Sequence, residues 1–128
     1  MRGSIVALAI LFLSSSAMAD WVKVDSNDLG TTYVDPSTIR RSGSKVKMWD
    51  LVDFRAAQGA KNGQQVRSIR AQSEYDCEES AKRAIYVSAH AGNMANGNIV
   101  TLITQAGDWT PIAPESVVEA KWKIACKK

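Results

Sequence analysis

Hydrophobic and polar residues alternate along most of the chain, and this period of two is typical of half-buried β-strands. The clearest case is the segment 45–54, KVKMWDLVDF. One of its faces would carry Val46, Met48, Val52 and Phe54, and the other Trp49 and Leu51 together with Lys45, Lys47 and Asp53. Because both faces hold large apolar residues, this strand is expected to be central in a sheet or sandwiched between layers.

Five further segments follow the same pattern, and turn residues separate them. The expected strands are 21–25, 31–34, 66–76, 82–91 and 99–104. Segment 35–38 (DPST) predicts a turn or a single helical turn, with Asp35 as its cap and Pro36 at its first position. Segment 40–44 predicts a flexible basic connection. Segment 56–65 predicts a turn that suits a hairpin, because it contains the pair Asn62-Gly63.

The spacing changes near the C-terminus. Pro111 and Pro114 exclude a central strand or a helix interior at that point. From residue 115 onward, Val118, Trp122 and the pair at 125–126 recur at helical spacing. The pattern therefore predicts an α+β domain over residues 20–128, with a single antiparallel sheet of about six strands packed by one C-terminal helix. No internal repeat or second domain is indicated.

The first 19 residues have the order of a secretory signal peptide. A charged start at Arg2 precedes the apolar run 5–13 (IVALAILFL), and Ala17-Met18-Ala19 is an A-x-A site just before Asp20. The run is too short to cross a membrane, which takes about 20 apolar residues. We expect cleavage between Ala19 and Asp20. The remaining chain would be soluble, without a transmembrane segment, and would enter the bacterial periplasm or be secreted.

Cys77 and Cys126 are the only cysteines, and both remain after this cleavage. Disulfides persist in the periplasm, so an intrachain bridge is favoured over an interchain bridge, metal ligation or redox chemistry. The alternation of segment 66–76 continues to Cys77 and places it on the core side. The chain has one histidine and no C-x-x-C motif, so neither a metal site nor a redox site is indicated.

The order of several fragments resembles the surface-adhesin protein E family of proteobacteria, from about residue 21 to residue 126. The fragments that carry the resemblance are Tyr33-Val34-Asp35-Pro36 with Ile39, Tyr75-Asp76-Cys77, and Trp109 with Pro111 and Pro114. The resemblance implies an antiparallel sheet with a C-terminal helix and a disulfide between Cys77 and Cys126. It also implies adhesion to host matrix and plasma glycoproteins, and the ability to form a homodimer. The family's named member is a lipoprotein. This chain departs from it, because Ala19-Asp20 offers no cysteine for lipid attachment, and this puts display on the outer surface in doubt.

A search for catalytic groups favours a non-enzymatic protein. His90 lies on the polar side of its expected strand and is interpreted as an exposed structural residue. Asp50 and Asp53 fall on opposite strand faces, so they form no carboxylate pair. Asp76, Glu78 and Glu79 are interpreted as a solvated turn. No nucleotide, zinc or calcium motif is present, and no cofactor or metal is expected.

Basic residues offer the only sequence signal for binding. They occur in two groups, Arg40, Arg41, Lys45 and Lys47, and then Arg67 and Arg70. If adjacent strands bring the groups together, they form a positive surface for an acidic protein or glycan of the host or the envelope. The competing interpretation is that these residues are solvated strand faces. Nucleic acid is not expected, since no aromatic residues alternate with the basic run.

The four tryptophans, Trp21, Trp49, Trp109 and Trp122, are expected mainly in the core, with Trp109 as the best candidate for a surface role. Two hypotheses of function therefore stand. One is an envelope protein that binds a host protein or glycan. The other is a periplasmic structural or assembly accessory with no host ligand.

Overall fold

A computed structural model describes residue 3 and residues 19–59 and 62–128. Six main strands follow one another along the chain, and a helix ends it. The elements are β1 (Val22–Ser26), β2 (Gly30–Ser42), β3 (Lys45–Gly59), β4 (Gln65–Asp76), β5 (Ala81–His90), the short 3-10 helix η1 (Asn93–Ala95), β6 (Ile99–Ile103), β7 (Thr110–Pro111) and α1 (Val117–Cys126). The predicted signal peptide falls outside the described residues except at Gly3 and Ala19.

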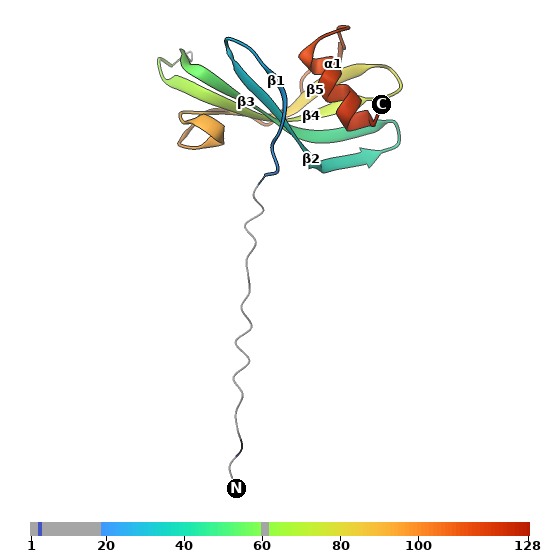
Figure 1. Cartoon of the computed structure of the whole chain (residues 1–128), viewed down its shortest axis with the longest axis horizontal. Helices are drawn as coiled ribbons and strands as arrows, with labels where there is room; N and C mark the ends of the chain where they lie inside the picture. The colour runs from blue at the N-terminus through green and yellow to red at the C-terminus, as the bar shows by residue number, and fades with distance from the viewer. Residues whose placement is uncertain (1–2, 4–18, 60–61) are drawn as a thin grey trace.

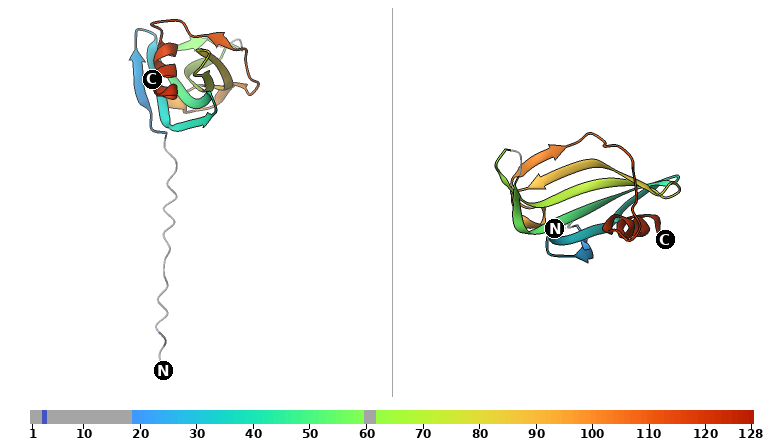
Figure 2. Two further views of the ribbon diagram at one scale, coloured as in Figure 1. Left: turned by 90° about the vertical axis from the view of Figure 1, so that its right-hand side faces the viewer. Right: turned by 90° about the horizontal axis from the view of Figure 1, so that it is seen from above.

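The strands form one antiparallel sheet in the order β1-β2-β3-β4-β5-β6, and β7 pairs with Ala81 and Lys82 at the start of β5. Every strand of the main path therefore pairs with its neighbour in sequence, as hairpins require. The sheet is strongly twisted and curled (Figure 1, Figure 2). The predicted fold class, a single sheet of about six strands packed by a C-terminal helix, is confirmed.

Alternation along the strands gives the sheet two distinct faces. On one face, the helix face, the cross-strand partners Val46 and Tyr75 are fully buried, as is Met48. They form the main core with Val34 and with the residues of α1. A smaller cluster around Phe54, Val66 and Ala89 fills the other end of the sheet. The central position predicted for β3 is confirmed, since it pairs with β2 on one side and β4 on the other.

Helix α1 begins and ends at residues suited to these positions. The Ser116 hydroxyl accepts a hydrogen bond from the Glu119 amide, and Lys127 ends the helix in the left-handed conformation with φ 56°. A disulfide joins Cys126, the last residue of α1, to Cys77, which follows β4 directly. The predicted bridge is confirmed, and both of its cysteines belong to the main core. The indole of Trp122 donates a hydrogen bond to the Asp76 carbonyl beside the bridge.

Segment 35–38 is not the separate turn or helical turn that the sequence indicates, because β2 continues through it as a large bulge. The pairing with β3 moves from Asp35 opposite Trp49 to Arg40 opposite Lys47. Pro36 has no amide to donate to the ladder. Instead, the Thr38 hydroxyl accepts from the Trp49 amide and donates to the Asp35 carbonyl. This side chain replaces the missing backbone pairing, so the strand resumes rather than ends.

Two other predicted connections are shorter than expected. Arg40, Arg41 and Ser42 belong to β2, and the turn consists only of Gly43 and Ser44. Gly43 has a φ of +62°, a conformation that favours glycine. Strand β3 likewise continues past residue 56 to Gly59. In both places cross-strand pairing with a neighbour extends the strand beyond its own hydrophobic pattern.

Candidate binding surface

The face of the sheet opposite α1 presents polar and aromatic side chains in rows that run across the strands. One row consists of Asp35, Trp49, Gln72 and Tyr86, each opposite the next on β2, β3, β4 and β5. The adjacent row consists of Arg40, Lys47, Glu74 and Arg83. Directly opposed residues on antiparallel strands share a face and lie close together. The register therefore gathers charged and aromatic residues from between positions 35 and 86 of the chain on one surface.

Arginine and aromatic rings stack in the centre of this surface. The guanidinium carbon of Arg70 lies 4.3 Å from the centre of the Trp49 ring. The Tyr86 ring meets Trp49 edge to face, with centroids 5.2 Å apart. Arginine over a tryptophan face is an attractive arrangement, because the negative face of the ring meets the cation. These contacts hold three long side chains in place on a face that remains partly exposed.

A second stack lies beside the first and involves the loop before β7. The Arg83 guanidinium lies 4.7 Å from the centre of the Trp109 ring, and the Lys45 ammonium lies 6.0 Å from it. The loop is fixed by a hydrogen bond from the Gly107 amide to the Ala84 carbonyl, 2.8 Å long. Trp109 keeps 36% of its surface exposed. We define the cation–aromatic cluster by the members of both stacks, which are Lys45, Trp49, Arg70, Arg83, Tyr86 and Trp109.

Acidic residues on the same face neutralise part of its positive charge. Glu74 forms an ion pair of 2.7 Å with Arg83, and Asp76 lies 3.9 Å from the Lys45 ammonium. The amides of Glu79 and Glu78 donate to the Asp76 carboxylate, which lowers the pKa of that carboxyl, and Lys45 lowers it further. In the turn predicted at 76–79, the Asp76 carboxylate therefore accepts the hydrogen bonds of the two backbone amides that follow it.

The structure separates the six basic residues that the sequence offers as a surface. Arg40, Lys45, Lys47 and Arg70 lie on the face opposite α1, in register with the aromatic row. Arg41 is opposite Val46, so it is on the helix face. Arg67 lies far along β4, next to a different pocket. The sequence missed Arg83 and the part played by Trp49, because only the register of β3, β4 and β5 brings them together.

The tryptophans differ from their predicted place in the core. Only Trp122 packs against a core cluster. Trp49 and Trp109 instead stack with cations on the opposite face, and Trp109 is exposed as expected. Alternation alone cannot distinguish these roles, because a sheet with both faces partly apolar accepts a tryptophan on either.

A pocket of about 380 Å³ adjoins the aromatic row. Two tryptophans, two arginines, three polar residues and the alanine before the predicted mature N-terminus line it. They are Ala19, Trp21, Asp35, Ser37, Thr38, Arg40, Trp49 and Arg70. The pocket thus combines flat aromatic surface with cationic and hydrogen-bonding groups, which suits a polar or anionic ligand.

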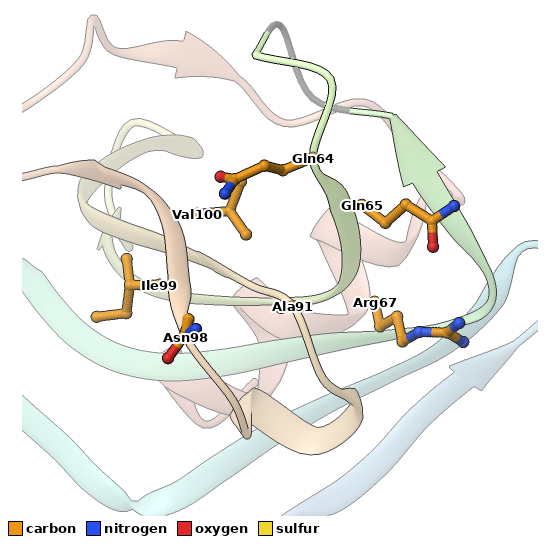
Figure 3. Close-up of a pocket in the computed structure, with 7 residues that line it drawn as sticks. All are labelled: Gln64, Gln65, Arg67, Ala91, Asn98, Ile99 and Val100. Carbon is orange, nitrogen blue, oxygen red and sulfur yellow. The ribbon is translucent and has the colours of Figure 1, made fainter.

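A second pocket, of about 340 Å³, lies at the far end of the sheet (Figure 3). Gln65 and Arg67 of β4 lie on one side of it, and Asn98, Ile99 and Val100 on the other. Among the described residues that line it, Arg67 is the one charged side chain, and they include no pair of groups suited to acid–base chemistry.

His90 is buried, and the expectation of an exposed histidine is wrong. It retains only 7% of its surface, and its Nε2 atom lies 2.8 Å from the Ser88 hydroxyl. Segment 92–98 folds back over this end of the sheet, where Ser68 donates to the Gly92 carbonyl and accepts from the Ala95 amide. Burial, followed by the nearby Arg70 cation, lowers the pKa of His90.

This burial predicts a loss of stability in mild acid. Below a pH of about 6.5 the unfolded chain binds a proton at His90 that the folded chain resists, so the free energy of unfolding falls as pH decreases toward the lowered folded pKa. His90→Gln removes this titration. We expect the variant's unfolding free energy to depend less on pH between 6.5 and 5 in urea titrations. An identical pH dependence of the two proteins would contradict the assignment.

Ionisable groups also cluster beneath α1. The Lys121 ammonium lies 3.3 Å from an Asp50 carboxylate oxygen, and both side chains are less than a tenth exposed. Ser73 lies 3.5 Å from the same oxygen. Burial and the Lys121 charge lower the pKa of Lys82, and burial and Asp50 raise the pKa of Tyr75. The cluster is enclosed by the helix, so it is a feature of the core rather than a surface site.

Asp50 and Asp53 lie on opposite faces of β3, as predicted. Asp50 faces α1, whereas Asp53 accepts hydrogen bonds from the Asn93 side chain and the Met94 amide. Among the residues that the structure describes, no three histidines, cysteines or carboxylates are placed to hold a metal ion. Within those residues, no helix is long and apolar enough to cross a membrane.

Comparison with known proteins gives one family. The model of the family described as surface-adhesin protein E matches residues 21–127. No curated protein matches the chain in sequence.

Solved structures of protein E from Haemophilus influenzae have the same fold. One of them is 13% identical, with a TM-score of 0.66 over 86% of each chain. Another, from a non-typeable strain, is 13% identical, with a TM-score of 0.63 over 87% of this chain and 78% of the other. At this identity the likeness concerns the fold alone.

Proposed function

Because this chain belongs to the surface-adhesin protein E family, we propose that it is an exported, non-enzymatic adhesin that binds matrix or plasma glycoproteins of a host. The cation–aromatic cluster is the proposed binding surface. The observation that carries this assignment is the stacking of Arg70 and Arg83 on the partly exposed rings of Trp49 and Trp109. Tryptophan, tyrosine and arginine dominate the energetic centres of protein interfaces.

The arrangement favours partners that carry negative charge. Arg40 and Lys47 lie beside the cluster, and no ion pair involves them among the described residues. Exposed cations of this kind accelerate encounter with acidic glycans or acidic protein segments, and salt weakens their effect. The exposed aromatic rings add contact area that depends little on salt. A partner with anionic groups on an extended, partly apolar surface fits both properties.

We expect Trp49→Ala and Arg70→Ala each to weaken binding at least about tenfold, the effect of losing about 1.4 kcal/mol at an interface centre. The probes are immobilised basement-membrane extract and a plasma glycoprotein fraction, measured by biolayer interferometry at two salt concentrations. Arg41→Ala is the matched control, since Arg41 belongs to the neighbouring basic run but is on the helix face. Equal losses for Arg41→Ala and Arg70→Ala would contradict the proposed surface, and thermal unfolding of each variant excludes loss of fold.

The absence of a cysteine at the predicted cleavage site supports a second candidate function, that of a periplasmic accessory without a host ligand. Protease treatment of intact cells separates the two proposals. An adhesin displayed on the surface is degraded, whereas a periplasmic protein is protected until the outer membrane is opened. We also propose a homodimer, for which the uncharged edge strand β6, with Leu102 and Ile103 about half exposed, offers a surface.

A further inference from the structure

The Asp35 carboxylate is held in the β2 bulge with little contact with solvent. The residue is 3% exposed. One of its oxygens accepts hydrogen bonds from the Ser37 amide, at 3.0 Å, and from the Ser37 hydroxyl, at 2.5 Å. The other oxygen accepts a hydrogen bond of 3.2 Å from the backbone nitrogen of Asp20. Asp20 is the residue at which the sequence predicts the processed chain to begin.

Among the described residues, no cation lies within ion-pair distance of this carboxylate, although Arg40 and Arg70 line the same pocket. Asp35 belongs to none of the ion pairs formed in the described part of the chain. Arg40, the basic residue closest to it in sequence, donates to the carbonyls of Ser37 and Ile39 instead. A buried carboxylate without a cationic partner is costly, because it has lost the hydration that stabilises its charge.

Removal of the signal peptide changes the chemistry of the Asp20 nitrogen, which donates to the second Asp35 carboxylate oxygen. Hydrolysis of the Ala19–Asp20 bond consumes one water, gives Ala19 a carboxylate, and turns the Asp20 amide nitrogen into an α-amine. The α-amine is protonated at neutral pH, since its ordinary pKa is about 8. A neutral N–H donor at 3.2 Å from Asp35 thereby becomes an ammonium group.

The position of this nitrogen does not depend on the leader. Strand β1 pairs with β2 from Val22 opposite Val34 onward, two residues after Asp20. Continuing this antiparallel register brings the residues before Val22 alongside those after Val34, where Asp35 lies. The pairing of β1 therefore keeps the new terminus next to the carboxylate once the leader has gone.

We propose that cleavage after Ala19 completes an ion pair between the new Asp20 ammonium and the buried Asp35 carboxylate, so that processing stabilises the domain. The inference rests on the proposed export and processing of the chain, and not on ligand binding. Before cleavage, the carboxylate is held by hydrogen bonds alone. The precursor is therefore less stable than the processed domain, which suits a chain that must cross a membrane before it folds.

The test compares two precursors that are exported and processed in the same way. One has the natural sequence, and the other has Ala-Ser inserted between Ala19 and Asp20, which leaves Asp20 with a neutral amide. Mass analysis establishes each mature terminus, and urea unfolding at pH 7 gives the stabilities. We expect the insertion to raise the unfolding equilibrium constant about tenfold. Asp35→Asn in both chains is expected to abolish the difference.

A pH series gives a second readout that does not require the Asp35→Asn proteins to fold. The ammonium has its pKa raised by the carboxylate, so its stabilising effect is complete below about pH 8 and disappears as pH rises through the folded pKa. The other charged groups beside this carboxylate are Arg40 and Arg70, which line the same pocket, and the Asp20 side chain. The advantage of the natural chain is therefore expected to vanish in alkali.

Three results would overturn the proposal. The first is a natural mature terminus other than Asp20, and the second is equal stability of the two processed chains at pH 7. The third is an advantage that persists unchanged in alkali or with Asp35→Asn. Both chains keep the cation–aromatic cluster, so binding to the matrix and plasma fractions reports on the proposed function separately.

Discussion

Replacing both cysteines, as Cys77→Ala with Cys126→Ala, is expected to lower the free energy of unfolding by about 4 kcal/mol. The bridge closes a loop across a sequence separation of 49, and the loss of this constraint increases the conformational entropy of the unfolded chain. The effect is a large share of the 5–15 kcal/mol that stabilises a typical domain. Urea unfolding of the purified variant and of the oxidised natural protein measures it directly.

Reduction of the natural protein supplies the control. A thiol reductant is expected to bring its stability close to that of the double alanine variant and to leave the variant unchanged. A loss of less than about 1 kcal/mol in the variant would show that the main core stabilises α1 without the bridge. Dissociation of a dimer by reductant would instead indicate an interchain bridge in solution.

The second large effect is expected from the ion pair beneath α1. Asp50→Leu should destabilise the domain by about 3–5 kcal/mol, because it leaves the Lys121 ammonium buried without its carboxylate. Combining Asp50→Leu with Lys121→Met replaces the pair by apolar groups and is expected to recover most of the loss or to exceed the natural stability. Urea unfolding of the two single variants and the double variant gives the coupling between the sites.

The same helix provides a matched control. Lys123 forms an ion pair of 3.5 Å with Glu119 one turn earlier, but the Lys123 side chain is half exposed. Removal of Lys123 is therefore expected to change the stability by no more than about 0.5 kcal/mol. If Asp50→Leu cost as little, the buried pair would not contribute in the way that its enclosure indicates. If the Asp50→Leu, Lys121→Met double variant were no more stable than Asp50→Leu alone, the loss would be attributed to Lys82. This second cation also lies near Asp50 and would have lost its nearby negative charge.

Much of the fold could be predicted from local pattern. The strict alternation of segment 45–54 identified the central strand and assigned Val46 and Met48 to the core face. Turn residues separate the first two expected strands, and there the Asn27 side chain accepts from the amides of Leu29 and Gly30. Helical spacing located α1, and the two cysteines gave the bridge. Each of these features depends on residues close in sequence or, for the cysteines, on a single choice of partner.

The features that local pattern missed depend on distant partners. The bulge in β2 requires the Thr38 hydroxyl to pair with the Trp49 amide, 11 residues away. His90 is buried because segment 92–98 folds back toward Ser68 on another strand. The cation–aromatic cluster depends on register, since a shift of one residue in β4 would turn Arg70 to the other face. Basic residues were therefore visible in the sequence, but the grouping that excludes Arg41 and adds Arg83 was not.

The place of α1 in the chain sets the order in which this domain can assemble. Hairpin pairing can begin as soon as β1 to β4 are available, because each strand pairs with the next. The main core, however, needs Ala125 and Cys126 of α1, which leaves a ribosome or a translocation channel after all seven strands. Oxidation of Cys77 must wait for the same event. The domain therefore acquires its buried core and its disulfide together, after α1 has been delivered to an oxidising compartment.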